Sequence, residues 1–218
     1  MNLSELPSVL WQGTVETAQM VVWSALLTAL LGLPIGVLLV VTDRGGLRPL
    51  PMIKAMLGAV VNVGRSLPFI VLMVAILPFT RLVTGTTIGT VAAIVPLTLG
   101  AVPFYARLVE TALRGVGREV VEAAQAMGAR RLTIVVKVLL PEAVPQLVAG
   151  LTVTVVALIG YSAMAGAIGG GGLGDLAVRY GYQRFDTGVM VVTVVLLVII
   201  VQLVQFLGDA VARKLSHQ

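Results

Sequence analysis

The chain has 218 residues, of which 58% are hydrophobic and only 11% charged. Soluble domains average about 45–50% apolar and about 25% charged residues, so the mean hydropathy of +1.02 predicts a polytopic membrane protein without a separate soluble domain. We attribute the net charge of +5 to membrane orientation rather than to nucleic-acid binding. The chain has no cysteine, and its single histidine is His217; we therefore expect no thiolate or histidine metal site within the membrane.

Five apolar segments are long enough to cross a bilayer, which takes about 20 residues of helix. The predicted spans lie at about residues 14–41, 55–77, 89–109, 146–168 and 187–208. The predicted fold is therefore a single all-α domain, residues 1–218, with five transmembrane helices. Residues 1–13 form a short lead. The first span is longer than a bilayer requires, and we expect Pro34 to kink it.

The second predicted span contains one charged residue, Arg65, about eleven residues from its start. A charge near the middle of a span costs about 2.5–3.5 kcal/mol. Two interpretations stay open. Arg65 extends to the cytoplasmic interface along its aliphatic stem, or it is buried and binds backbone carbonyls of a broken helix or a substrate carboxylate.

Charged residues cluster between the third and fourth predicted spans. Val120–Met127 are good helix formers, too few to cross a bilayer. Gly128 stands where a helix end favours a left-handed residue, and Thr133 could cap the apolar run that follows. Pro141 and Pro145 should break or kink what comes next. We expect a short helix, a tight turn and a second short helix at the membrane surface, shaped to be held by another protein.

This segment, about residues 112–145, also carries a fixed spacing: Glu-Ala-Ala, three residues, Gly, nine residues, an aliphatic residue, one residue and Leu-Pro. The positions are Glu122, Ala123, Ala124, Gly128, Val138, Leu140 and Pro141. The pattern resembles the EAA loop of ABC-importer permeases, the membrane subunits of ATP-driven uptake systems. It departs only at Val138, where that family usually has isoleucine. The stretches RSLPF (residues 65–69) and GYSAMAGAIGGGGLG (residues 160–174) are similar to methionine-importer permeases in particular.

The resemblance implies a permease that forms the pathway for a small amino-acid-type solute, methionine, and that is not itself an enzyme. It implies coupling to a separate ATPase through Glu122, Ala123, Ala124, Gly128, Leu140 and Pro141. No cofactor is expected in this chain, because ATP and Mg²⁺ would bind the ATPase. The implied partners are a second copy of the chain, two cytoplasmic ATPase subunits, an extracytoplasmic solute-binding protein and the lipid bilayer. The implied location is the bacterial inner membrane.

The distribution of Lys and Arg predicts the orientation, because cytoplasmic loops carry an excess of them. With five spans, one side has eleven of these residues and the other has three; Arg65, within a span, is not counted. The richer side includes the 112–145 loop and the C-terminus. We therefore expect that loop and the C-terminus in the cytoplasm, where an ATPase could reach them, and the N-terminus outside.

Two further groups of residues suggest hypotheses of their own. Tyr161, Ser162 and Met164 lie among small residues in the fourth predicted span, which favours close helix packing over a pathway-lining role. The run Gly169–Gly174 is followed by Asp175 instead of the Lys-Ser/Thr of a phosphate-binding loop. A flexible helix end is the better interpretation there, although a hinge beside the pathway stays open.

Two other functional classes fit less well. A secondary, ion-coupled transporter usually has acidic residues within the membrane and inverted repeats. Here Glu16, near the outer end of the first predicted span, is the only such acid, and no repeat is apparent. An intramembrane hydrolase would need a nucleophile with a base beside it, and His217 cannot serve from the tail.

Overall fold

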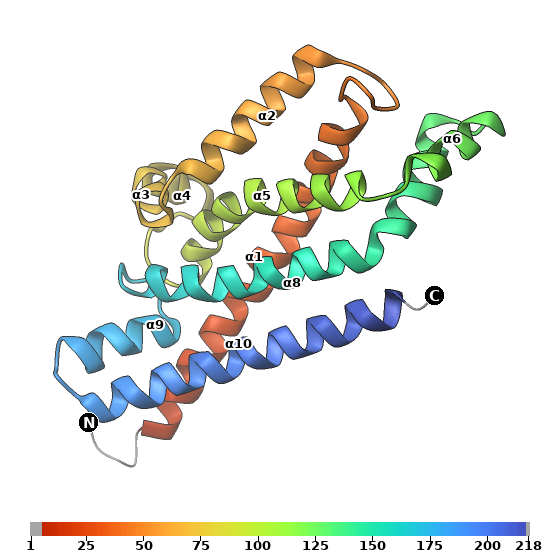
Figure 1. Ribbon diagram of the computed structural model, residues 1–218. Coiled ribbons are helices and arrows are strands. Elements are labelled where there is room, and N and C mark those ends of the chain that lie inside the picture. Colours follow the sequence, from red (N-terminus) through yellow and green to blue (C-terminus); the bar gives the residue numbers. More distant parts are fainter. Residues whose placement is uncertain (1–5, 217–218) are drawn as a thin grey trace. The chain divides into compact units, whose positions relative to one another are not determined.

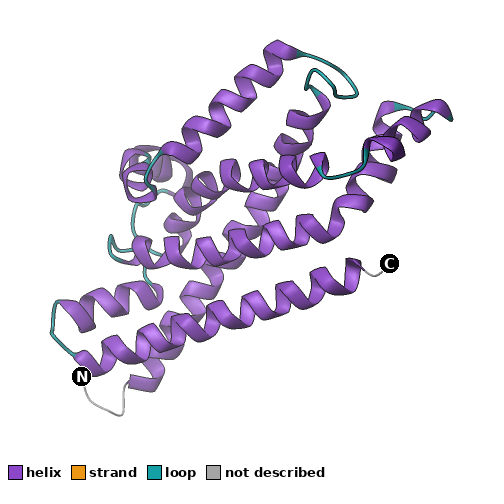
Figure 2. Cartoon of the chain, viewed as in Figure 1, coloured by secondary structure: helices purple, strands orange, loops and turns teal. Residues whose placement is uncertain are grey.

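The computed structural model describes residues 6–216, and every regular element among them is a helix (Figures 1 and 2). In chain order these are α1 (Leu6–Val41), α2 (Pro51–Ser66), α3 (Phe69–Ala75), α4 (Leu77–Thr84), α5 (Thr90–Arg114), α6 (Arg118–Ala126), α7 (Arg131–Ile134), the π-helix η1 (Val135–Leu139), α8 (Leu140–Gly166), α9 (Gly172–Leu176), the π-helix η2 (Ala177–Tyr182) and α10 (Thr187–Ser216). The all-helical prediction is confirmed for these residues.

Four helical segments of the described chain are long and apolar enough to cross a membrane. They are α1, α5, the continuous stretch Arg131–Gly166, and α10. The bent pair α2 and α3 makes a fifth if it is counted as one span. Counted in that way, the helices match the predicted five-span architecture, with one span that is not a straight helix.

The second predicted span, 55–77, differs most from the structure. It is broken after Ser66, because Pro68 disfavours helical geometry at the residue before it and lacks an N–H of its own. Helix α3 then begins at Phe69. The outer loop expected at 78–88 is itself largely helical, since α4 occupies Leu77–Thr84. The apolar residues form one continuous run there, so hydropathy alone indicated neither the break after Ser66 nor helix α4.

The other predicted spans are shorter than the observed helices or displaced from them, and Pro34 and Pro145 lie inside continuous helices. Helix α1 already begins at Leu6 and continues through Pro34, so the described part of the lead belongs to the first helix. Helix α5 continues to Arg114 instead of ending near residue 109. Helix α8 begins at Leu140 and contains both prolines that were expected to break or kink it, so neither breaks it. Helix α10 includes most of the expected tail, and α9 with η2 fills most of the expected polar loop before it.

The chain divides into two compact units, and α1, α5, α8 and α10 each contribute to both. The first unit contains described residues 6–27 together with 67–101 and 154–205. Its core is built around Met20, Leu97 and Leu158, whose side chains are fully buried. Each of the three comes from a different long helix, so the core fastens these helices together.

The second unit contains residues 28–66, 102–153 and described residues 206–216. In this unit α1 and α5 approach closely because α1 presents glycines to α5. A methyl group at Gly36 would lie 2.5 Å from Val109, and one at Gly32 would lie 3.0 Å from Tyr105. Small residues at such contacts are a common device for packing membrane helices. The candidate functional site is in this unit.

Candidate functional site

Helix α6 ends in a turn that its sequence specifies. Gly128 has φ +77°, a conformation that glycine adopts at little cost. The Gly128 N–H donates to the Gln125 carbonyl at 2.9 Å, and the Ala129 N–H donates to the Ala124 carbonyl at 3.1 Å. This pair of bonds is a Schellman motif, which satisfies the last carbonyls of a helix. The prediction that Gly128 ends this helix in a left-handed conformation is confirmed.

The two alanines of the Glu-Ala-Ala motif face different surroundings. Ala124 is only 4% exposed and packs in an apolar cluster with Leu113 of α5 and Leu139 of η1. Ala123 and Glu122 are exposed. Of the two alanines expected to take part in coupling, only Ala123 is exposed to a partner, and the small side chain of Ala124 fits the unit's own core.

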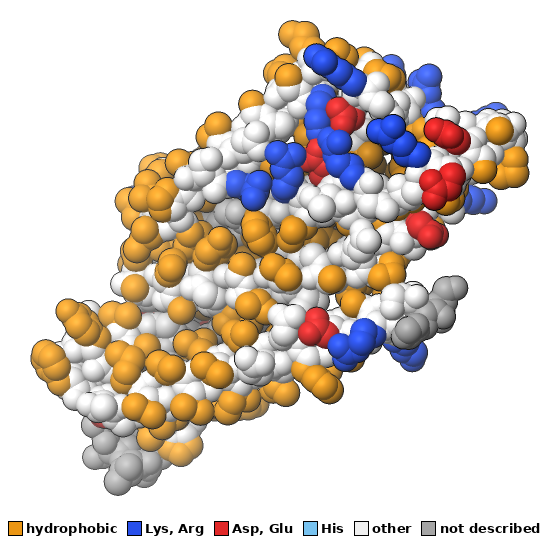
Figure 3. Space-filling model, viewed as in Figure 1, with side chains coloured by type: hydrophobic (Ala, Val, Ile, Leu, Met, Phe, Trp, Pro, Cys, Tyr) orange, Lys and Arg blue, Asp and Glu red, His pale blue; other side chains and the backbone are white. Residues whose placement is uncertain are grey.

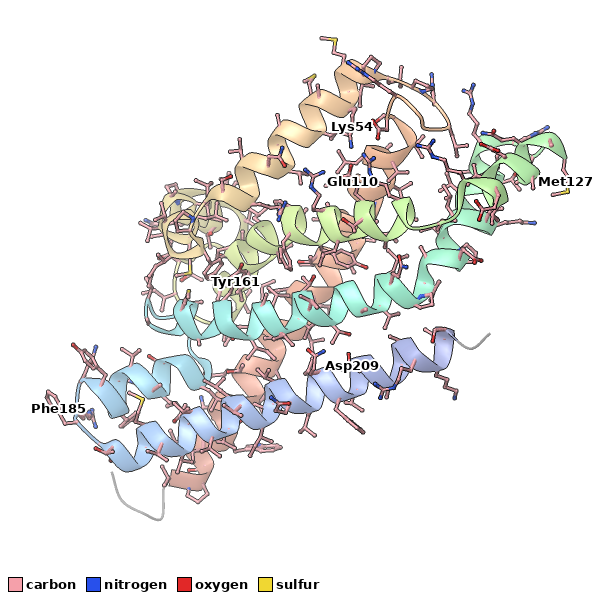
Figure 4. All side chains as sticks on the ribbon, viewed as in Figure 1. Lys54, Glu110, Met127, Tyr161, Phe185 and Asp209 are labelled. Atoms are coloured by element: carbon pink, nitrogen blue, oxygen red, sulfur yellow. The ribbon has the colours of Figure 1, made fainter. Side chains whose placement is uncertain are left out.

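Beyond α6, the exposed surface of this segment is apolar in places. Met127, on the turn, is 82% exposed, and Leu132 of α7 is 74% exposed. Figure 4 shows Met127 projecting away from the turn. Apolar side chains are costly to leave in water, and clusters of them mark surfaces that contact other proteins. The Glu122–Leu132 segment thus combines a rigid turn with exposed apolar and charged groups.

The join to α8 is a π-helix rather than a capped helix start. Thr133, expected to cap, lies inside α7, which has Arg130 before it and no side-chain cap. The Leu140 N–H bonds to the Val135 carbonyl, five residues back. Pro141 comes next and has no N–H to donate to the helix. The wider π-helical turn just before it continues into α8 without a break. Leu140 packs against the apolar cluster around Ala124, while Pro141 is exposed.

A buried carboxylate joins α2 and α5 in the same unit. Glu110 is 2% exposed and pairs with Lys54 of α2 and with Arg107 and Arg114 of its own helix. Figure 4 shows Lys54 and Glu110 side by side, and Figure 3 shows the charged side chains gathered on this face. Glu110 stands three residues after Arg107 and four before Arg114, just beyond the predicted end of the third span. Their spacing of three and four residues was a usable signal for pairing along a helix.

The same cluster continues to the loop between α1 and α2. Arg114 Nη2 lies 2.6 Å from Asp43 Oδ2 and 2.8 Å from Glu110 Oε1. The Arg44 N–H donates to Asp43 Oδ1 at 2.9 Å. This backbone donor and the Arg114 charge hold the pKa of Asp43 below its usual range. A cavity of about 360 Å³ opens here, lined by the Asp43 loop, the end of α5 and one side of α6 that includes Glu122.

Arg65 lies in the last turn of α2 and is exposed. Among residues 6–216 its side chain makes no ion pair or hydrogen bond. Three residues earlier, Asn62 Oδ1 accepts a hydrogen bond from Arg107 Nη2 at 3.0 Å. Arg65 is therefore not buried within its own chain, and both extension to the cytoplasmic interface and contact with a solute stay hypotheses.

The fourth-span candidates belong to the first unit. Tyr161 stacks on Phe69 with ring centroids 4.4 Å apart and an interplanar angle of 7°. Ser162 is buried, and its hydroxyl donates to the Ile159 carbonyl at 2.8 Å. Met164 is 47% exposed. Packing thus accounts for Tyr161 and Ser162, while Met164 stays available for another contact.

Glu16, also in the first unit, has a structural partner that sequence reasoning missed. Its Oε2 accepts the Gly172 N–H at 2.7 Å, and Thr17 Oγ1 accepts the Leu173 N–H at 2.9 Å. Gly172 has φ +78°, and a methyl group there would lie 2.6 Å from Thr17 Oγ1. Both features require glycine, so this turn is a specified structure and not merely a flexible helix end. With its carboxylate engaged in this way, Glu16 is a weak candidate for ion coupling.

Comparison with known proteins agrees with this architecture. Residues 32–217 match the model of the family "Binding-protein-dependent transport system inner membrane component". The chain is 54% identical over 219 residues to the probable D-methionine transport system permease protein MetI of Vibrio cholerae, covering 100% of this chain and 95% of that protein. It is 46% identical over 209 residues to the methionine import system permease protein MetP of Bacillus subtilis, covering 96% and 94%.

Solved structures give the same result. A chain of the MetNI methionine ABC transporter in an inward-facing conformation superposes with a TM-score of 0.96 at 47% identity, covering 99% of both chains. A chain of an amino acid ABC transporter crystallised with histidines has a TM-score of 0.81 at 15% identity, covering 97% of this chain and 96% of that one, and shares the fold. The expected family is thereby confirmed: this chain belongs to the binding-protein-dependent transport system inner membrane components, the multi-pass permeases of ABC importers.

Proposed function

We propose that this chain is the permease of an ATP-driven methionine importer. Its relatives in Vibrio cholerae and Bacillus subtilis carry methionine transport in their names, and identity to both extends over nearly the whole chain. Two copies would enclose the pathway. An extracytoplasmic binding protein would deliver the solute, and two ATPase subunits, which bind ATP and Mg²⁺, would supply the energy.

The observation that carries the coupling role is the α6 turn. Helix α6 is short and ends at a left-handed glycine, and Met127 and Leu132 are exposed beside it. Its inner face, through Ala124, packs into the core of the second unit. A partner that holds the exposed side of α6 would therefore move the packed helices with it. Glu122, Ala123, Gly128 and Pro141 are the residues we assign to this contact or to its shape.

The proposed orientation places α6 in the cytoplasm with the C-terminus, and the N-terminus outside. The excess of Lys and Arg on the α6 side supports it. In this orientation the face that we assign to the ATPase meets the compartment that contains ATP.

Reconstitution with partners tests the proposal. The tagged permease is produced with the ATPase and the binding protein of the same transport system, purified and placed in liposomes. We expect ATPase subunits to co-purify, and ATP turnover to rise when the binding protein carries L- or D-methionine but not histidine. A permease that purifies without an ATPase, or turnover that does not respond to methionine, would overturn it.

A further inference from the structure

Helix α2 has two faces of opposite character. At about 100° per residue, Lys54, Asn62 and Arg65 fall within one arc of about 80°, here called the polar arc. The opposite side, the apolar arc, consists of exposed side chains, namely Met52, Met56, Val60 and Val63. A helix exposed on both faces has two different environments to meet, and only the apolar arc suits lipid.

The depth of Arg65 sharpens the contrast. Eleven residues at about 1.5 Å each place it about 16 Å along α2 from Lys54, about half of a hydrocarbon core roughly 30 Å thick. A charge exposed at that depth faces water or protein, because hydrocarbon does not solvate it. The polar arc therefore turns away from lipid.

The cations along this face differ in whether they have an acidic partner. Lys54, Arg107 and Arg114 all pair with the single buried carboxylate of Glu110, and Arg107 also holds the Asn62 side-chain oxygen. Arg65, at the end of α2, is exposed, and its side chain has no partner among residues 6–216. The face consequently offers an unneutralised guanidinium beside a polar side chain that is fixed in place.

We infer that the polar arc of α2 lines the water-filled pathway and that Arg65 receives the carboxylate of the passing solute. The inference rests on the proposed transport of an amino acid, which always presents a carboxylate. A guanidinium offers two parallel N–H groups to the two carboxylate oxygens. Asn62, whose side-chain oxygen accepts a hydrogen bond from Arg107, keeps the surface next to Arg65 polar. The other cations of this face are paired with Glu110 and so do not compete with Arg65 for the solute carboxylate.

Cysteine reactivity tests the pathway, and the cysteine-free sequence gives no background. Asn62→Cys probes the polar arc, and Val60→Cys, 68% exposed, is the matched control two residues away on the apolar arc. Each variant is assembled with its ATPase in lipid and treated with membrane-impermeant anionic and cationic thiol reagents from the cytoplasmic side. We expect modification at Asn62→Cys and none at Val60→Cys.

Adding Arg65→Gln to Asn62→Cys should lower the ratio of anionic to cationic reaction rates by about tenfold, since a cationic lining concentrates anions. Methionine should slow modification at Asn62→Cys, whereas methioninol, which lacks the carboxylate, should not. Gly58→Cys, in the middle of the polar arc and with no atom within 4 Å of a methyl group placed there, is the second probe if Asn62→Cys does not assemble.

Two outcomes would overturn the inference. In one, the Asn62 and Gly58 positions are as unreactive as Val60, as expected if a second copy covers them. In the other, methioninol protects as well as methionine. Methionine uptake by the unmodified transporter is measured in parallel, so normal uptake with either outcome would reject the role of Arg65 and leave the proposed function standing.

Discussion

Replacing Gly128 with valine isolates the geometry of the α6 turn. Gly128 has φ +77°, and a methyl group built there meets no atom within 4 Å. The cost is therefore one of backbone conformation, with no clash in this chain. Left-handed backbone costs an L-residue about 1–2 kcal/mol, and a β-branched side chain is at the upper end. At about 1.4 kcal/mol per factor of ten, the ATPase should bind roughly 5–30 times more weakly.

The assay is a titration of the lipid-reconstituted permease with purified ATPase, with methionine uptake measured in parallel. Gly128→Asn should lose less, because asparagine tolerates the left-handed region. Gly85→Val is the matched control. Gly85 has φ +76° and equally open surroundings, but it lies after α4 in the first unit. The Gly85→Val variant should lower stability to a similar extent and leave ATPase binding intact.

Normal affinity of Gly128→Val for the ATPase would contradict a role of the turn in docking. Equal weakening by Gly85→Val would also contradict it, since the effect would then reflect general destabilisation.

Three further tests use substitutions elsewhere in the chain. Glu110→Gln leaves three cations around a neutral side chain and should lower the stability of the assembled transporter by about 3 kcal/mol, seen as a lower thermal unfolding temperature. A cysteine at Thr86 should react with an impermeant thiol reagent from outside, and one at Ser216 only after the cytoplasmic face is opened. Ala124→Leu should destabilise the second unit by about 1–3 kcal/mol through overpacking, whereas Ala123→Leu should keep its stability and weaken ATPase binding.

Each of the three has a contradicting result. For Glu110, the control is Asp175→Asn, because in the Asp175–Arg179 pair the side chains are 24% and 50% exposed, against 2% for Glu110, and pairs near the surface are worth about 0–1 kcal/mol; an equal loss from both would mean that burial of Glu110 is unimportant. Reversed reactivity of the two cysteines would invert the orientation and remove the cytoplasmic α6. Equal behaviour of the two leucine variants would show that the faces of α6 are misassigned.

Local signals in the sequence were sufficient for part of the site. Gly128 could be predicted because a left-handed helix end depends on the residue itself and its immediate neighbours. The motif around Glu122 likewise identified the segment, but it did not indicate whether Ala123 or Ala124 faces the interior. Neighbouring residues on a helix point about 100° apart, and the face that packs is set by Leu113 and Leu139, which come from other parts of the chain.

Contacts distant in sequence were not predictable in the same way. The pairing of Lys54 with Glu110 joins residues 56 positions apart, and no periodicity connects them. The break after Ser66 was missed because the apolar residues on its two sides form one continuous run. Pro68 was the available signal for a break, but the hydropathy of the whole run favoured one continuous span.

The packing of α6 determines what an ATPase could move. Ala124 joins α6 to a cluster that includes Leu113 of α5, Ile134 of α7 and Ala143 of α8, with Val37 of α1 packed against it. Interiors packed in this way transmit displacement, because they compress little. The charge cluster around Glu110 ties α2 to the same unit. A force applied at α6 in the proposed importer would therefore shift the second unit as a body, including the polar arc of α2, and would not be absorbed by a flexible loop.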